Sequence, residues 1–210
     1  MYNIGADTTR YIPSTSFHIP LSLFALQSGI IPNENTSIQS GDSTQKIQCA
    51  SLISAFQNNE DSCFSMIAKK MTEPVFKKWL DSLHYGNTKT GKDFSQCWND
   101  KSLIISPDEQ LGLMKKLYFD QLPFRQSVQK SVRDMMKAED NNLYTLSWKQ
   151  SNPIKTIDGT YSSWVTGWIE ENRHVYFFVT YAESTVQNKD NTASITKDIL
   201  RKYEFFQGKK

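Results

Sequence analysis

The hydrophobic periodicity of this chain changes near residue 143. Before that point apolar residues recur every three or four positions, as they do along amphipathic helices; beyond it, segments rich in β-branched and aromatic residues take over. The expected strands and the helix that closes the chain lie at 143–149, 162–170, 175–182 and 195–206. A helical part followed by strands and a terminal helix predicts an α+β domain.

The helical part is expected to span about residues 16–140, and the sheet with its terminal helix about 141–210. No repeat or linker divides the chain, so a single domain covering 1–210 is expected. The clearest helix start is at Ser106, where Pro107 suits the first helical position and Glu109 completes a capping box. Further helices are expected at 16–28, 47–56, 73–83 and 125–137, and after Asp61 or Ser62. In the terminal helix the residues expected to face inward are Ile199, Leu200, Tyr203 and Phe206.

The composition argues against several classes of protein. An apolar content of 38% over 210 residues is enough for a large core, and a net charge of +2 gives no electrostatic reason to expect nucleic-acid or membrane binding. Three cysteines without Cys-x-x-Cys spacing argue against a disulfide framework or a zinc site, and leave one unassigned bridge open. The histidines show no metal-ligand spacing, so no metal or other cofactor is expected.

The stretch Tyr11–Pro20 opens the first helix and carries a candidate reactive pair. Thr15 and His18 are three positions apart and therefore share one face of a helix. A hydroxyl beside a potential base has the geometry of an activated nucleophile. The structural alternative is that Ser14 or Thr15 simply caps the helix.

The residues Pro13-Ser-Thr-Ser-Phe-His-Ile-Pro20 are similar to the pattern Pro-x-Ser-Thr-Phe-Lys-Ile-Pro around the nucleophile of class D β-lactamases. Further landmarks of that family follow in the same order: Trp79-Leu-Asp81, Tyr85-Gly-Asn87, Trp98 and Leu103-Ile-Ile-Ser106. The resemblance extends over nearly the whole chain. It implies the penicillin-recognising fold with an antiparallel sheet, and the family's activity, which is hydrolysis of β-lactams by serine acyl transfer.

The catalytic positions depart from the family pattern. The nucleophilic serine falls on Thr15. The family's lysine, implied to be carboxylated by carbon dioxide and to act as the general base, falls on His18, whose imidazole cannot form that carbamate. The serine of a second element, Ser-x-Val, falls on Asn59 in an ungapped reading, which we prefer to a gapped reading at Ser62.

The cationic positions differ as well. The family's Lys-Thr-Gly strand element precedes a tryptophan, and the triplet before Trp148 is Thr145-Leu146-Ser147, which lacks both the lysine and the glycine. The arginine implied to hold a substrate carboxylate is absent around Thr192, where Lys189 is the nearest cation. Five binding positions keep the residue that the family pattern has: Tyr85, Gly86, Asn87, Trp98 and Trp148. The alternative is a structural role, as a turn for Tyr85, Gly86 and Asn87 and as packing for Trp98.

These departures predict a class D β-lactamase-like protein that is catalytically inactive. One alternative is a weak or repurposed β-lactam-binding or hydrolysing enzyme that uses Thr15 and His18, with Asn59, Thr145 and Ser147 as altered supporting positions. The small molecule expected to bind, weakly, resembles a β-lactam or peptidoglycan.

A second alternative is a module that binds a partner through the sheet. The family carries strands before its nucleophile that would cover the edge near 175–182, and they are missing here. An uncovered edge predicts strand exchange or a homodimer. Without an apolar leader or a stretch of about 20 apolar residues, the chain as written is expected to be cytoplasmic; the family is exported, so a longer precursor would place it in the periplasm.

Overall fold

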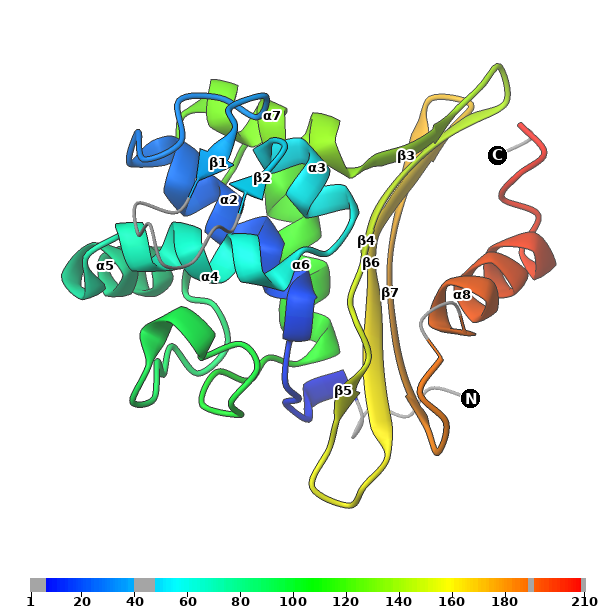
Figure 1. The fold of residues 1–210 in the computed structure, drawn as a ribbon. Helices are drawn as coiled ribbons and strands as arrows, with labels where there is room; N and C mark the ends of the chain where they lie inside the picture. The colour runs from blue at the N-terminus through cyan, green and yellow to red at the C-terminus, as the bar shows by residue number, and fades with distance from the viewer. Residues whose placement is uncertain (1–6, 40–47, 189–190, 209–210) are drawn as a thin grey trace.

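An antiparallel sheet separates a layer of helices from a single helix near the C-terminal end (Figure 1). The computed structural model describes residues 7–39, 48–188 and 191–208. The strands of this sheet are β3 (Lys137–Asp140), β4 (Tyr144–Gln150), β5 (Ile154–Lys155), β6 (Tyr161–Glu171) and β7 (His174–Ser184). β6 is central, because it pairs with β4, β5 and β7, while β3 pairs with β4. The predicted α+β class and its three long strands are confirmed; the short strands β3 and β5 were not predicted.

The helical layer follows the predicted order of helices. Its elements are η1 (Ser14–Phe17), α2 (His18–Gln27), α3 (Leu52–Gln57), α4 (Asp61–Lys70), α5 (Glu73–Leu83), η2 (Phe94–Gln96), α6 (Pro107–Tyr118) and α7 (Gln126–Met136), with a small ribbon of β1 (Ile38–Gln39) and β2 (Gln48–Cys49). The capping box at Ser106 and Glu109 is present. The helix predicted at 47–56 is wrong in its first part, because β2 occupies it and the Ser51 side chain caps a helix that begins at Leu52.

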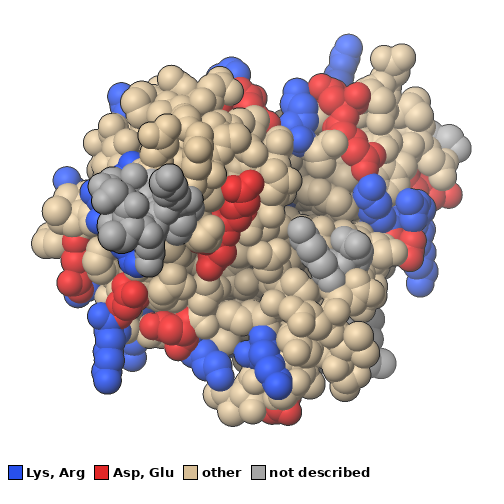
Figure 2. Space-filling model, in the orientation of Figure 1, with Lys and Arg blue, Asp and Glu red and all other residues tan. Residues whose placement is uncertain are grey.

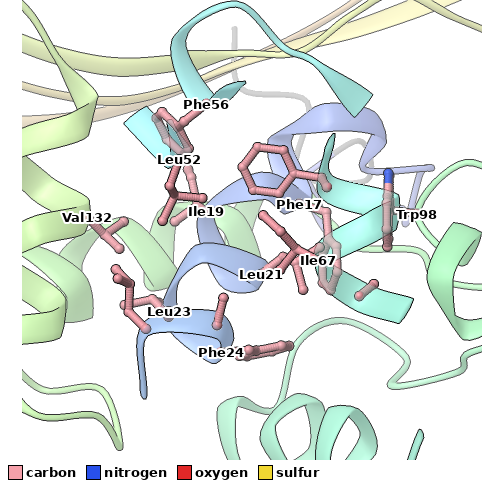
Figure 3. Close-up of a cluster of buried hydrophobic side chains, with 14 of the residues drawn as sticks. Phe17, Ile19, Leu21, Leu23, Phe24, Leu52, Phe56, Ile67, Trp98 and Val132 are labelled. Carbon is pink, nitrogen blue, oxygen red and sulfur yellow. The ribbon is translucent and has the colours of Figure 1, made fainter. Parts of the chain in front are cut away.

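Helix α2 passes through the middle of the core and positions the residues at its start. Every residue from Ile12 to Leu26 is buried, and a helix that is apolar on all sides is typical of a protein interior. Figure 3 shows its side chains surrounded by residues of neighbouring elements, among them Leu52, Ile67 and Val132. Neither η1 nor α2 has a side-chain cap. Packing therefore fixes this turn, and the capping alternative for Ser14 and Thr15 is wrong.

Helix α8 (Asn191–Lys202) lies on the opposite face of the sheet (Figure 1). Its buried residues include Thr192, which bonds to Ser163 of β6, and Thr196, whose Oγ1 is 2.8 Å from Oγ1 of Thr180 on β7. Leu200 is buried as predicted, but Ile199 is 45% exposed and Tyr203 58%. The predicted inward face is wrong there because hydroxyl groups, rather than apolar side chains, attach the first half of the helix to the sheet.

The described part of the chain contains no helix that is both long and apolar enough to cross a membrane. Acidic and basic side chains are interspersed over the face of the molecule that Figure 2 shows, in keeping with the small net charge.

Candidate active site

The Thr15 hydroxyl is enclosed by its own chain. The residue is 2% exposed, and its Oγ1 donates a hydrogen bond to Oδ1 of Asn59 at 3.1 Å. The same oxygen accepts the backbone N–H of Asn152 at 2.7 Å. The ungapped reading therefore places Asn59 beside Thr15, and the structure brings these two predicted residues together.

Asn152, which follows β4, connects three segments at this point. Its carbonyl accepts the Ser14 hydroxyl at 2.9 Å, and its Nδ2 donates to the carbonyl of Asn59 at 3.2 Å. Together with the bond to Thr15, these contacts join the end of β4 to η1 and to the residues before α4. The segments meet directly around the hydroxyl, where a substrate would have to approach it.

His18 is the first residue of α2 and is 0% exposed. Its ring stacks on Phe64, with the ring centres 3.7 Å apart, and its Nε2 lies 3.2 Å from Oδ1 of Asp61. Burial lowers the pKa of His18 to about 4, and the nearby charge of Lys149 adds to this, although the bond to Asp61 acts in the opposite direction. The imidazole is therefore neutral at pH 7, and within the described chain its buried Nδ1 has no hydrogen-bond partner.

Asp61 holds the centre of this polar cluster. Its Oδ1 accepts the Nε1–H of Trp98 at 2.7 Å, and its Oδ2 accepts the side-chain amide of Asn99 at 2.7 Å. Burial raises the pKa of Asp61, but the bonds from His18, Trp98 and Asn99 outweigh it, so the pKa lies below its ordinary value. Asp61 also begins α4, where a helix N-terminus favours a carboxylate. Trp98 thus has a carboxylate partner besides its packing on Phe17.

The triplet predicted beside the nucleophile lies elsewhere. Thr145 Oγ1 donates to Asp140, and Thr145 and Ser147 line a separate cavity of about 400 Å³ together with Arg133. The ring of Trp148 packs on the α8 side of the sheet, with Lys197 Nζ 5.5 Å from its centre. The prediction that Thr145 and Ser147 support the Thr15 site is not met by their positions, because the register is shifted by a few residues along β4. Trp148, predicted as a binding residue, is among the residues that line a groove shared with Asn59.

A buried lysine that the predicted register passed over, Lys149, lies close to this site. It is 3% exposed, its Nζ donates to the carbonyl of Phe56 and lies 4.2 Å from that ring centre, and its charge acts on His18. Lys149 precedes Asn152 by three residues, so the segment that faces Thr15 is Lys149–Asn152. The residue two positions after this lysine is Ser151, so the family's glycine is still missing. Side chains alternate between the two faces of a strand, so Lys149 shares a face of β4 with Thr145 and Ser147. This alternation is the sequence signal that would have located Lys149.

Tyr85, Gly86 and Asn87 form a structural turn close to η1. The Gln110 amide donates to the Tyr85 hydroxyl at 3.1 Å and to the Ser16 hydroxyl at 2.9 Å. Gly86 has a φ of +54°, and a Cβ there would lie 2.0 Å from the carbonyl oxygen of Ile104. Asn87 donates to the Ser102 carbonyl and accepts the Ile104 N–H. The turn therefore anchors the segment that follows Trp98.

A groove runs beside the site without reaching the predicted nucleophile. Its volume is about 530 Å³, and Asn59, Trp148, Lys149 and Gln150 are among its lining residues. Thr15 and His18 do not line it. Lys189, the cation expected near Thr192, lies outside the described residues.

A disulfide fixes the start of α4. Cys49 of β2 is bonded to Cys63, with their Cα atoms 6.2 Å apart, which assigns the bridge that the sequence left open. Glu60 lies beside this pair, but the sulfurs are already bonded to each other and are not available as thiolate metal ligands. Cys97 is free and buried, and burial raises the pKa of its thiol to about 12.

Comparison with known proteins identifies the scaffold. The model of the penicillin-binding protein transpeptidase domain matches residues 1–201. The chain belongs to this family. It is 31% identical to the regulatory protein BlaR1 of Bacillus licheniformis over 96% of its own length, and 32% identical to the β-lactamase OXA-20 of Pseudomonas aeruginosa over 85%. It spans 34% and 66% of the lengths of these two relatives.

The solved structure of a class D β-lactamase from Bacillus subtilis matches with a TM-score of 0.86 at 28% identity, covering 98% of this chain and 86% of that one. The predicted class D β-lactamase-like family and fold are thus confirmed. Within this scaffold the residues at the Thr15 and His18 positions form hydrogen bonds to their own chain. The arrangement orients a hydroxyl toward an amide oxygen and an imidazole toward a carboxylate.

Proposed function

We propose that this class D β-lactamase-like protein does not hydrolyse β-lactams. The observation that carries the proposal is the enclosed Thr15 hydroxyl, whose proton is directed at Oδ1 of Asn59 and whose oxygen accepts the Asn152 N–H with one of its two lone pairs. Acylation requires a group that removes the hydroxyl proton, and an amide oxygen is not a base at neutral pH. The nucleophile position therefore lacks an activating partner.

The base position supports the same proposal. The Nε2 of His18 faces Asp61, and a pKa of about 4 makes this imidazole a weak proton acceptor compared with a group poised near pH 7. The family's carbamate cannot form on an imidazole. The family's cationic lysine has a counterpart in Lys149, but its Nζ is directed at the carbonyl of Phe56.

The test is covalent labelling by a penicillin-like acylating probe, followed by intact-mass spectrometry. We expect no adduct on the wild-type chain at saturating probe, while a class D β-lactamase run in parallel is labelled. The Thr15→Ser/His18→Lys variant is the matched chain with the family residues restored at both positions, and we expect little labelling there because Asn152 still closes the site. An adduct mapped to Thr15 of the wild type overturns the proposal.

One observation favours a second candidate, a weak or repurposed acyl-transfer enzyme. With its Nε2 proton directed at Asp61, neutral His18 has a lone pair on Nδ1, and this buried atom has no partner in the described chain. If the hydrogen bond between Asn152 and Thr15 opened, the Thr15 hydroxyl and the His18 base would become accessible to a substrate. In this case the adduct forms on Thr15, and its rate falls when His18 is replaced by Gln and when the pH is lowered through the pKa of His18.

A non-covalent ligand is proposed for the groove of about 530 Å³ that Asn59 and Lys149 line. Its expected chemistry, that of a β-lactam or a peptidoglycan-like fragment, carries a carboxylate that a lysine can attract. One of the relatives is named as a regulatory protein and not as a β-lactamase, so a role other than hydrolysis has a parallel among the names of the relatives. Chemical-shift changes confined to the groove residues on titration with an intact penicillin would support this ligand, and their absence would exclude it.

We also propose an oxidising compartment for the folded protein. The Cys49–Cys63 disulfide favours an extracytoplasmic location over the cytoplasmic one expected from the sequence, because cytosolic thiols are kept reduced. Alkylation of the protein at the moment of cell lysis tests this: two protected cysteines support the location, and three reactive thiols contradict it.

A further inference from the structure

Two cysteines and a glutamate meet where β2 approaches the start of α4. Cys49 lies on β2, Cys63 lies in the first turn of α4, and Glu60 immediately precedes that helix. Each of the three offers one ligand atom, a sulfur or a carboxylate oxygen, and these atoms lie within 4.8 Å of one another. The disulfide accounts for the two cysteines, but it has no need of the carboxylate beside it. Two sulfurs and a carboxylate are a donor set that Zn²⁺ binds in proteins.

The carboxylate of Glu60 is directed at the sulfurs. Its Oε2 lies 3.1 Å from Sγ of Cys63, while Nδ2 of Asn58 lies 3.5 Å from its other oxygen, Oε1. A disulfide sulfur has no proton to donate, so the contact with Oε2 is not a hydrogen bond in the oxidised chain. One oxygen is thus turned toward the sulfur pair and the other toward an amide, which is how a metal-ligating carboxylate is oriented by its outer partners.

The backbone holds the three residues in place independently of the disulfide. Cys49 pairs with Ile38 in the β1–β2 ribbon. The N–H of Glu60 donates to the carbonyl of Ala55 at 2.9 Å, and the N–H of Cys63 donates to the carbonyl of Glu60 at 3.0 Å. The Cα atoms of the two cysteines are 6.2 Å apart. A tetrahedral zinc ion with Zn–S distances of about 2.3 Å holds its sulfurs roughly 3.8 Å apart, which rotation of the two side chains reaches from this backbone.

We propose that the reduced chain binds one Zn²⁺ at Cys49, Cys63 and Glu60, with a water molecule as the fourth ligand. Two thiolates favour Zn²⁺ over the hard ions Mg²⁺ and Ca²⁺, and the carboxylate favours it over Cu⁺. The three ligands carry one more negative charge than the ion neutralises, and the N-terminus of α4 beside them stabilises this excess. The sequence did not reveal the site, because its ligands lie on separate elements and not in a Cys-x-x-Cys motif.

The zinc site and the disulfide exclude each other. A trialkylphosphine and one water molecule convert the disulfide into two thiols and a phosphine oxide, so the sulfurs gain two electrons and the phosphorus loses two. Zn²⁺ then replaces the two thiol protons, which pass to the solvent. The ion joins β2 to α4 in the reduced chain, as the disulfide does in the oxidised one. Asn59 and Asp61 flank Glu60, so either link also fixes the segment that contacts Thr15 and His18.

The test is a metal titration of the untagged chain after reduction by a trialkylphosphine and removal of the reductant under argon. Co²⁺ is the spectroscopic probe, and competition with a chromophoric chelator measures the affinity for Zn²⁺. We expect one Co²⁺ per chain with sulfur-to-metal charge-transfer absorption, and its displacement by one Zn²⁺. The oxidised chain should bind neither ion. Zn²⁺ should raise the unfolding temperature of the reduced chain and leave that of the oxidised chain unchanged.

Variants identify the ligands. Glu60→Gln removes one ligand and keeps the shape of the side chain, so the affinity of the reduced chain for Zn²⁺ should fall about 100-fold. Cys49→Ala/Cys63→Ala should abolish binding. One matched control is Glu73→Gln, at an exposed glutamate that begins α5, and the other is Cys97→Ala, which removes the remaining thiol. Both controls should bind Zn²⁺ as the wild type does.

Circular dichroism follows the reduced chain during the titration. A chain that loses structure on reduction should regain it with Zn²⁺, and one that stays folded should keep its spectrum while the charge-transfer band appears. A reduced chain that takes up neither ion overturns the proposal, whether or not it is folded. So does an oxidised chain that binds as tightly as the reduced one. Wild-type affinity in Glu60→Gln, or loss of binding in Cys97→Ala, would show that the ion is held by other residues.

Discussion

The polar cluster around Thr15 and the edge of β7 are opposites in how they use their hydrogen-bonding groups. In the cluster, the Thr15 hydroxyl, the Asp61 carboxylate and the Trp98 indole are satisfied by other residues of the same chain, whereas the buried Nδ1 of His18 has no partner within the described chain. At the edge, β7 pairs on one side only among the described residues, and on α8, which packs on the same sheet, Ile195 is 37% and Ile199 45% exposed. In a catalytic scaffold the reverse is expected, with unsatisfied groups in the cleft and a covered edge.

This difference indicates which of the two regions has polar groups that remain available to a ligand or partner. Reactive sites often contain groups that lower stability, so that their removal stabilises the protein. A polar group that is bonded within its own chain has the opposite property, because its removal leaves its partners unpaired. Stability measurements on the cluster therefore distinguish a closed structural element from a site retained for chemistry.

The strongest test of this comparison is Asp61→Leu. The change leaves the Nε1–H of Trp98 and the amide of Asn99 without their acceptor and frees His18 Nε2, so we expect a loss of about 4 kcal/mol in the free energy of unfolding. Urea denaturation measures it. Asp108→Leu is the matched control, an exposed aspartate in the first turn of α6, and should cost less than about 1 kcal/mol. A gain in stability from Asp61→Leu would break the comparison.

The next largest effect is expected from the disulfide. Cys49→Ala/Cys63→Ala opens a loop whose ends are 14 residues apart, which costs about 3 kcal/mol. A reducing agent should bring the wild-type chain to the same stability and leave the variant unchanged, because Cys97 is already a thiol. The bond joins β2 to α4 and not to the sheet, so we expect the β6–β7 pairing, followed by hydrogen exchange of the β7 amides, to persist. Loss of that protection on reduction would mean that the two regions are coupled.

A third test uses the pH dependence of stability. The pKa of His18 is about 4 in the folded chain against 6.5 in the unfolded one, so the unfolded chain binds the proton first as the pH falls. The stabilisation is complete above pH 6.5 and is lost as the pH falls toward 4, which amounts to about 2 kcal/mol at pH 5. His18→Gln should remove this slope, whereas His174→Gln, at an exposed site, should keep it. An unchanged slope in His18→Gln would show that the imidazole is not buried.

The fold was accessible from the sequence because its signals are local. The change of period near residue 143 and the capping box at Ser106 predicted elements that the structure contains. Strands β3 and β5 were missed because four and two residues are too few for a periodic pattern. The inward face of α8 was misassigned because Thr192 and Thr196 attach it through hydroxyls, which no apolar pattern reveals.

The candidate site was predictable only where its residues lie in one short motif. Thr15 and His18 were located by the stretch around them, and Asn59 by an ungapped reading of the family's second element. Asp61 was expected only as a possible helix start, yet its role depends on Trp98 and Asn99, which are 37 and 38 positions away. Lys149 was passed over because Trp148 was aligned with the tryptophan that follows the family's Lys-Thr-Gly element. That alignment placed the element a few residues too early along β4. Contacts over such separations are set by the tertiary structure and not by spacing.

The smallest expected effect, and the most specific, concerns Thr15 itself. Thr15→Val keeps the shape of the side chain but leaves the Asn152 N–H and the Asn59 Oδ1 without a partner, so we expect a loss of about 1–2 kcal/mol. Thr15→Ser retains the hydroxyl and both hydrogen bonds but removes a buried methyl group, so we expect a loss of about 0.8 kcal/mol. Thermal unfolding of the three chains measures the difference. If Thr15→Val were more stable than the wild type, the hydroxyl would be a strained group kept for reaction, and the contrast between a closed site and an open edge would no longer hold.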